Sequence, residues 1–256
     1  MACIAALSLL SCGAREARPS GLTIAAAANL TAAFGEIGRA FTRKTGVPVT
    51  YSYGATSLLA QQIENAAPFD LFAAADTQHV DALIRNGKLL PESRAIYARG
   101  QLALWSPNPD RTPVRGLQDL ASPAVRYIAL ANPSAAPYGE AAVAALRAAG
   151  LWERLQPKIV YGSNIIQAKQ FAASGNAEAA ITAYSLLLQD PGAVVKVDEN
   201  LHQPLDQALA IVAGSHRRHE AARFAAFVLA SEGRTILSRH GYRFHEPEAP
   251  PRPQAH

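Results

Sequence analysis

The chain has 256 residues, of which 49% are hydrophobic, so it can bury a sizeable core or form two lobes without cross-links. Its formal net charge of +4 at pH 7 is small and its Lys and Arg residues form no dense stripe, which argues against nucleic acid as a partner. Both cysteines, Cys3 and Cys12, lie in the first twelve residues, which excludes a disulfide framework or a Cys-ligated metal site in the body of the chain.

Residues 1–20 have the composition of a targeting segment and a tether. Residues 1–10 are almost wholly apolar but too few to span a bilayer, and the sequence Leu-Leu-Ser-Cys-Gly around Cys12 resembles a bacterial lipobox. No Lys or Arg precedes the apolar run. We expect a periplasmic or extracytoplasmic protein, with a lipid anchor at Cys12; the alternative is an apolar terminus of a cytosolic protein.

Strand and helix patterns alternate along the rest of the chain. Apolar residues between 30 and 41 recur at spacings of four, three and four, which predicts an amphipathic helix that Gly46 ends. The predicted strands lie at residues 22–28, 47–53, 70–74, 102–105, 126–130, 159–161, 179–183, 194–197 and 208–213. The predicted helices lie at residues 30–41, 58–63, 79–86, 139–149, 166–173, 185–189, 219–231 and 233–240.

Repeated strand-then-helix units predict an α/β fold with mixed, mostly parallel sheets. Two candidate crossings, near residues 98–104 and 201–209, divide the chain into two lobes. We expect lobe I to comprise residues 21–99 and 206–245, and lobe II residues 100–205. The tail at 246–256 contains four prolines and is predicted to be disordered.

Four short segments share one format, at residues 27–31, 54–57, 132–139 and 162–165. Each follows a predicted strand, is rich in small or hydroxyl residues, and opens a helix. Helix N-termini carry unpaired backbone N–H groups and a partial positive charge, so several converging ends form an anion site without Lys or Arg. The alternative for each segment alone is an ordinary helix cap.

Three stretches carry a family resemblance. The run "AAAANLTAAFGEIGRAFTRKTGVPVTYSYGATSLLAQQIENAAPFDLFAAAD" resembles the periplasmic molybdate-binding proteins of ABC transporters, and "ANPSAAPYGEAAVAALRAAGLWERLQPKIVYGSNIIQA" and "SEGRTILSRHGYRF" continue the resemblance to residue 244. It implies the type II periplasmic-binding-protein fold, in which two α/β lobes joined by a two-crossing hinge hold the ligand between them.

The resemblance also implies which residues bind the ligand. Asn29 falls where the family has an Asn or Ser ligand, and Thr56 at a hydroxyl ligand, with Ser57 beside it. Tyr138 and Ile165 fall at positions that offer a backbone N–H. Losing the Asn29 side-chain donor is expected to weaken binding by about 1–3 kcal/mol, because a buried charged acceptor would lose a partner.

Three positions are weaker candidates. Some family members place a ligating Tyr at a strand end where this chain has Ala183, with Tyr184 one residue later. The hydroxyl of Tyr138 replacing that ligand is a hypothesis. Ala28, in the first segment, is the third weaker candidate.

The resemblance implies a solute-binding protein that delivers molybdate or tungstate to a membrane permease. Such a protein acts as a monomer without a catalytic residue or cofactor, and it binds the metal only through the oxyanion's oxygens. The alternatives are a receptor for another oxyanion, such as sulfate or phosphate, a regulatory effector domain, or an enzyme on the same fold. Asp70 and Asp76 are the candidate carboxylate pair for an enzyme. His216, His219 and Glu220 are the candidate metal ligands, although their spacing matches no strong zinc pattern.

Overall fold

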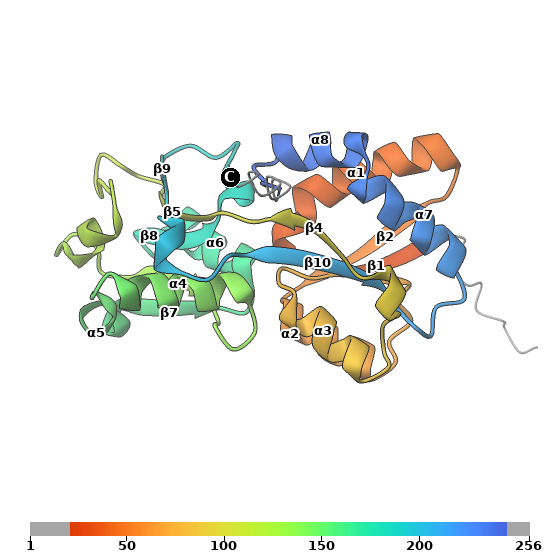
Figure 1. Ribbon diagram of the computed structural model, residues 1–256. Coiled ribbons are helices and arrows are strands. Elements are labelled where there is room, and N and C mark those ends of the chain that lie inside the picture. The colour runs from red at the N-terminus through yellow and green to blue at the C-terminus, as the bar shows by residue number, and fades with distance from the viewer. Residues whose placement is uncertain (1–20, 245–256) are drawn as a thin grey trace, which may run out of the picture.

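The computed structural model describes residues 21–244, and in that part of the chain the strands form two separate five-stranded sheets (Figure 1). The first sheet has the order β2-β1-β3-β10-β4. Its strands are β1 (Leu22–Ala27), β2 (Val49–Gly54), β3 (Leu71–Ala73), β4 (Ala95–Arg99) and β10 (Asp206–Ile211). β1 pairs in parallel with β2 and β3, whereas β10 runs antiparallel to β3 and β4.

The second sheet repeats this arrangement in the order β7-β6-β8-β5-β9. Its strands are β5 (Leu102–Ser106), β6 (Ile128–Ala131), β7 (Ile159–Gly162), β8 (Ala179–Ala183) and β9 (Ala193–Lys196). β6 pairs in parallel with β7 and β8, and β5 runs antiparallel to β8 and β9. The molecule therefore has two α/β lobes, each built around one mixed sheet.

Helices cover both faces of the first sheet (Figure 1). On one face lie α1 (Thr31–Thr45) and α7 (Arg218–Leu229), with α8 (Ser231–Arg239) packed against both; on the other lie α2 (Thr56–Glu64) and α3 (Gln78–Arg85). The alternation of side chains along β1 explains the two layers: Ile24 packs in the core that contains Phe34 of α1, while Ala25 packs in the core that contains Leu59 of α2.

The second sheet is covered in the same way. Its faces carry α4 (Pro137–Ala148) with α5 (Trp152–Leu155), and α6 (Ile165–Ala173). Leu130 of β6 lies in the core with Leu146 of α4, whereas Ala129 lies in the core with Ala168 of α6. Short 3₁₀ helices complete the fold: η1 (Ala28–Leu30), η2 (Pro91–Ser93), η3 (Leu117–Ala121), η4 (Gln156–Lys158), η5 (Tyr184–Leu186) and η6 (Glu199–Leu201).

Two chain crossings join the sheets, one from β4 to β5 and one from β9 to β10. The crossings are tied together beside the first sheet, where the Gly100 N–H donates to the Leu205 carbonyl at 2.9 Å. The Arg99 guanidinium also donates two hydrogen bonds to the Asp206 carboxylate, at 2.6 and 2.8 Å. These paired bonds keep the two crossings side by side as a hinge.

The α/β, two-lobed fold is confirmed, with two differences in detail. Strand β4 was not predicted; it lies at the edge of its sheet and pairs only with β10. Parallel and antiparallel pairings are equally frequent in each sheet, rather than mostly parallel, because a strand from the far side of the hinge inserts antiparallel into each. The predicted signal segment, the lipobox and the disordered tail lie outside the described residues, and the exact lobe bounds stay a prediction.

Candidate functional site

The first half of the candidate site lies where β1 and β2 end. These strands are parallel, so η1 and the N-terminus of α2 follow them at the same edge of the sheet. Asn29 lies in η1, and Thr56 and Ser57 are the first two residues of α2. Helix starts leave backbone N–H groups without intrahelical partners, so this edge presents donors.

The second half lies where β6 and β7 end, at the corresponding edge of the second sheet. The helices that follow them, α4 and α6, begin at Pro137 and Ile165. β6 and β7 are parallel, so these two N-termini also lie side by side. The predicted pattern of two helix starts in each lobe is therefore what the fold contains.

Three contacts bring the two halves together. The Ser57 N–H donates to the Ala135 carbonyl at 3.2 Å. The Ser185 hydroxyl donates to the Asn29 carbonyl at 3.2 Å. In addition, α6 packs against η1. All four predicted loops thus meet between the lobes, and residues 28–31, 55–57, 132–138 and 162–165 contain no charged side chain.

The side-chain amide of Asn29 donates its hydrogen bonds within the protein. The Asn29 amide nitrogen donates to the Gln207 Oε1 at 3.0 Å and to the Tyr242 hydroxyl at 2.9 Å. An amide nitrogen has two hydrogens, so both are used. In this geometry the Asn29 side chain has no amide hydrogen left for a ligand, and its role as a ligand residue stays a prediction. The donor that Asn29 offers at a helix start is its backbone N–H.

The Thr56 hydroxyl keeps a hydrogen that it can donate. Its buried hydroxyl oxygen accepts the Ala75 N–H at 3.2 Å, so the hydroxyl hydrogen is its remaining hydrogen-bonding group. The backbone N–H of Ser57 already donates to Ala135, so the group that Ser57 brings to the site is its hydroxyl.

The second lobe offers two backbone donors. In α4, Pro137 has no N–H, and the N–H groups of Gly139 and Glu140 both donate to the Ala136 carbonyl, so the Tyr138 N–H is the first donor of the helix. In α6, the Asn164 cap accepts from residues 166 and 167, so the Ile165 N–H is the first-turn donor that the cap does not use. Both residues are buried.

The role of the Tyr138 hydroxyl as a replacement ligand stays a hypothesis. It accepts a hydrogen bond from the Gln207 Nε2 at 3.0 Å, on the hinge side of the site. Burial raises the pKa of Tyr138 well above its usual value, so the phenol is neutral. Its side chain thus points to the hinge, while its backbone N–H belongs to the start of α4.

Tyr184 and Ala183 stay weaker candidates for the site. The Lys196 ammonium lies 4.4 Å from the centroid of the Tyr184 ring, and the Tyr184 N–H donates to the Gln101 carbonyl at 2.9 Å. Ala183 is a buried residue paired with Leu102 in the sheet. Ala28, like Asn29, lies in η1, and its carbonyl accepts the Thr31 hydroxyl at 2.7 Å.

Sequence reasoning missed a buried polar network behind the loops. Its members are Tyr97, Ser185, Gln207 and Tyr242, which join Asn29 and Tyr138. The only sequence signal was Gln207, a lone amide in the apolar strand "DQALAI". The partners are distant along the chain, so no local pattern connects them.

The alternative sites lack the arrangement they need. Asp70 and Asp76 lie beyond opposite ends of β3 and each carboxylate has its own partners, so they form no carboxylate pair. Asp70 accepts from the Thr23 N–H at 2.8 Å and the Ser215 hydroxyl at 2.7 Å. Asp76 accepts from both the backbone and the ring of His79, and that ring contact raises the pKa of His79.

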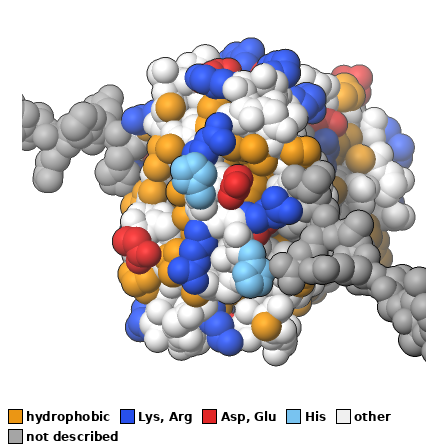
Figure 2. All heavy atoms as spheres, turned by 90° about the vertical axis from the view of Figure 1, so that its right-hand side faces the viewer, with side chains coloured by type: hydrophobic (Ala, Val, Ile, Leu, Met, Phe, Trp, Pro, Cys, Tyr) orange, Lys and Arg blue, Asp and Glu red, His pale blue; other side chains and the backbone are white. Residues whose placement is uncertain are grey.

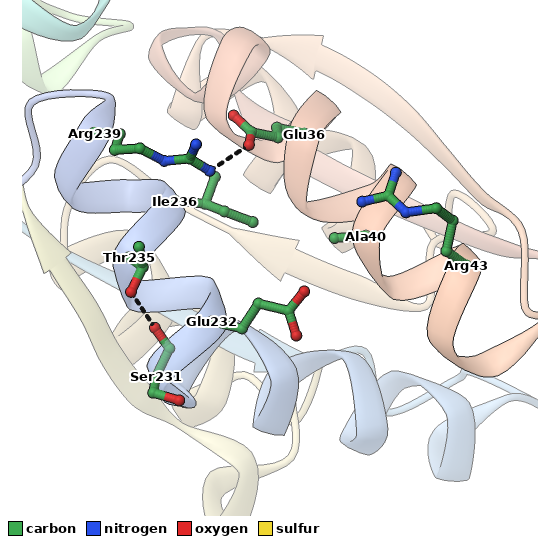
Figure 3. A pocket seen from close by; sticks show the side chains of 8 residues that line it. All are labelled: Glu36, Ala40, Arg43, Ser231, Glu232, Thr235, Ile236 and Arg239. Atoms are coloured by element: carbon green, nitrogen blue, oxygen red, sulfur yellow. Dashed lines mark hydrogen bonds and ion pairs between the residues drawn. The ribbon is translucent and has the colours of Figure 1, made fainter.

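A pocket between α1 and α8 is also unsuitable for an anion. It has a volume of about 320 Å³ and is lined in part by the carboxylates Glu36 and Glu232 (Figure 3). Glu36 already accepts from Arg239 at 2.5 Å and His240 at 2.9 Å, which lowers its pKa. Arg43 and Arg239 also line this pocket, so its charges are mixed and it does not resemble the set of neutral helix N-termini described above.

The end of the first lobe presents no single positive face (Figure 2). Figure 2 shows the end of the first lobe, where basic, acidic and apolar side chains are interspersed instead of forming one positive face. Among residues 21–244, no three His, Cys, Asp or Glu side chains are grouped to hold a metal ion. In the same residues, no helix has the length and apolar character needed to cross a membrane.

Comparison with known proteins agrees with the two-lobed geometry. Residues 22–243 match the family described as bacterial extracellular solute-binding protein. The chain belongs to this family. It is 34% identical to the molybdate-binding protein ModA of Rhodobacter capsulatus, over 93% of this chain and 94% of that protein. It is 35% identical to ModA of Azotobacter vinelandii, over 91% and 93% of the two chains.

Solved structures of extracellular solute-binding proteins share the fold. The periplasmic molybdate-binding protein of Azotobacter vinelandii superposes with a TM-score of 0.84 at 30% identity, covering 88% of this chain and all of that one. The sulfate-binding protein SubI of Mycobacterium tuberculosis gives a TM-score of 0.74 at 17% identity, covering 89% and 88% of the two chains. At that identity the second match speaks for the fold alone.

Proposed function

We propose that this solute-binding protein holds molybdate or tungstate between its lobes and delivers the ion to the membrane permease of an ABC transporter. One observation carries the proposal: four helix N-termini, two from each lobe, meet with neutral donors and no charged side chain in their loops. The names of the relatives with 34% and 35% identity support molybdate as the ligand class.

The proposed donors are the backbone N–H groups of Asn29, Tyr138 and Ile165 and the hydroxyls of Thr56 and Ser57. Molybdate is a dianion at neutral pH, so every oxygen accepts and none needs an acceptor from the protein. A protonated oxyanion such as hydrogen phosphate would turn an O–H toward donors and lose a hydrogen bond, which is unfavourable when buried. Neutral donors therefore select a fully deprotonated ion.

The proposed role is binding and transfer, without chemistry on the ion. Closing two lobes over a ligand buries it and presents a joint surface from both lobes, which a permease can recognise. The proposal places the protein outside the cytoplasm as a monomer, with a lipid anchor at Cys12.

Ligand-induced stabilisation tests this function. A ligand that binds only the folded state raises the unfolding free energy, by about 2.7 kcal/mol when its concentration is a hundred times its dissociation constant. We expect the thermal midpoint to rise with molybdate and tungstate, and to stay unchanged with equal concentrations of sulfate or phosphate. A rise with sulfate alone would keep the solute-binding role and replace the ligand. No rise with any of the four would reject the oxyanion site.

A further inference from the structure

Gln207 lies at the junction of the two halves of the candidate site. It is the second residue of β10, directly after the crossing from the second lobe, and its side chain is completely buried. Its Oε1 accepts from the Asn29 amide at 3.0 Å, and its Nε2 donates to the Tyr138 hydroxyl at 3.0 Å. One side chain therefore bonds to a proposed ligand residue from each lobe.

The surrounding groups hold Gln207 in one orientation. The Tyr97 hydroxyl lies 2.9 Å from the Gln207 Oε1 and donates to the Ala74 carbonyl at 2.8 Å. The single Tyr97 hydrogen goes to Ala74, so the Asn29 amide is the donor that fixes Oε1, and Nε2 therefore points to Tyr138. Asn29 is fixed in turn by the Tyr242 hydroxyl, which accepts from its amide and donates to its carbonyl at 2.8 Å.

The hinge leaves space for this contact. A Cβ atom at Gly100 would lie 2.0 Å from the Tyr138 hydroxyl and 2.6 Å from the Gln207 Nε2. Only glycine admits both groups against the crossing strand at this point. The Tyr138–Gln207 hydrogen bond therefore packs directly against the hinge backbone at Gly100.

We propose that Gln207 is a positioning residue of the anion site, which joins Asn29 of one lobe to Tyr138 of the other and so slows release of the bound ion. It touches the side chains of these residues, while their backbone N–H groups face the ligand position. The inference rests on the proposed function for its ligand. Opening the lobes must break the Tyr138–Gln207 bond, so this bond opposes dissociation without altering the donors themselves.

The test compares two Tyr-to-Phe variants of the full chain. Tyr138→Phe removes the hydroxyl that crosses between lobes. Tyr97→Phe removes an equally buried hydroxyl of the same network that bonds within the first lobe, and it serves as the matched control. Dissociation is followed by chasing radiolabelled molybdate with excess unlabelled ion, and association and ligand-free stability are measured beside it.

We expect Tyr138→Phe to speed dissociation about fivefold to tenfold, with the association rate changed less than about twofold, as for one interlobe hydrogen bond. Tyr97→Phe should lower ligand-free stability but leave dissociation within about twofold of the parent. Gln207→Met removes the Asn29 contact as well as the Tyr138 contact, so it should speed dissociation at least as much as Tyr138→Phe, and the double variant should be no faster than Gln207→Met. If Gln207→Met fails to fold, the two Tyr variants decide alone.

Two results would overturn the inference: unchanged dissociation in Tyr138→Phe, or equal acceleration in Tyr97→Phe. A parent protein that retains neither molybdate nor tungstate would instead reject the proposed function. In that case the radius of gyration of the ligand-free proteins, from small-angle scattering, decides the interlobe role. A larger radius in Tyr138→Phe than in Tyr97→Phe supports it, and equal radii reject it.

Discussion

At the residue scale, the Asn29 side chain has a structural role within the loop that was expected to bind the ion. Both of its amide hydrogens go to Gln207 and Tyr242. The Asn29 amide therefore serves the buried oxygens of Gln207 and Tyr242. In the proposed site, the group of Asn29 that faces the ion is its backbone N–H.

Replacing Asn29 tests that structural role. Asn29→Ala leaves the Gln207 and Tyr242 oxygens without a buried donor, so we expect the free energy of unfolding to fall by about 1–3 kcal/mol with no ligand present. Urea unfolding in oxyanion-free buffer measures this change. If ligand-free stability stayed at the parent value and only molybdate affinity fell, the side chain would be a ligand after all.

We expect the Thr56 side chain to donate a hydrogen bond directly to the ion. Thr56→Val keeps the shape and removes the hydroxyl hydrogen proposed to donate to the ion. A hydrogen bond to a charged group contributes about 1.5–3 kcal/mol, so molybdate affinity should fall about tenfold to a hundredfold. Calorimetric titration of the folded variant gives the affinity.

Thr31→Val is the matched control for Thr56→Val. The Thr31 hydroxyl, at the start of α1, donates to the Ala28 carbonyl at 2.7 Å and so has no hydrogen to offer the ion. Its affinity should remain within about twofold of the parent. Equal losses in the two valine variants would remove Thr56 from the site.

At the element scale, the helix starts depend on how closely each helix approaches its strand. In α4, a Cβ at Gly139 would lie 2.3 Å from the Ala131 carbonyl oxygen at the end of β6. This close approach fixes the first turn of α4 over the sheet edge. It therefore also fixes the backbone N–H of Tyr138.

Gly139→Ala should push α4 away from β6. We expect a loss of about 1–3 kcal/mol in stability from overpacking, together with weaker molybdate binding because the Tyr138 N–H moves. Gly116→Ala, in the same lobe, is the control, since its Cβ would meet no atom within 4 Å. Thermal unfolding with and without molybdate measures both effects. A Gly139→Ala protein as stable and as tightly binding as the control would contradict the close-packing argument.

Most elements were predictable because their signals are local. The 3.6-residue apolar period of residues 30–41 and the Gly46 stop predicted α1, which the structure ends at Thr45 with Gly46 in the left-handed conformation. Strand β4 was missed because its partner, β10, is about a hundred residues away. The roles of Gln207 and Tyr242 were missed for the same reason: a hydrogen bond between distant residues leaves no periodic trace in the sequence.

At the scale of the whole molecule, the two lobes differ little in plan. Each places two helix N-termini at the carboxyl edge of a mixed sheet, and the two crossings allow these edges to face one another. The proposed donors come from both edges. We therefore expect each chain to bind one ion, held jointly by both lobes.

Calorimetric titration at pH 7, with sulfate in large excess as a competitor, tests that expectation most directly. We predict that one molybdate or tungstate ion binds per chain and that excess sulfate does not displace it, because a site fitted to the longer Mo–O or W–O bonds would hold the smaller sulfate poorly. Binding of sulfate with equal affinity would contradict the proposed selectivity. A stoichiometry other than one, or no binding of any oxyanion, would contradict the shared site itself.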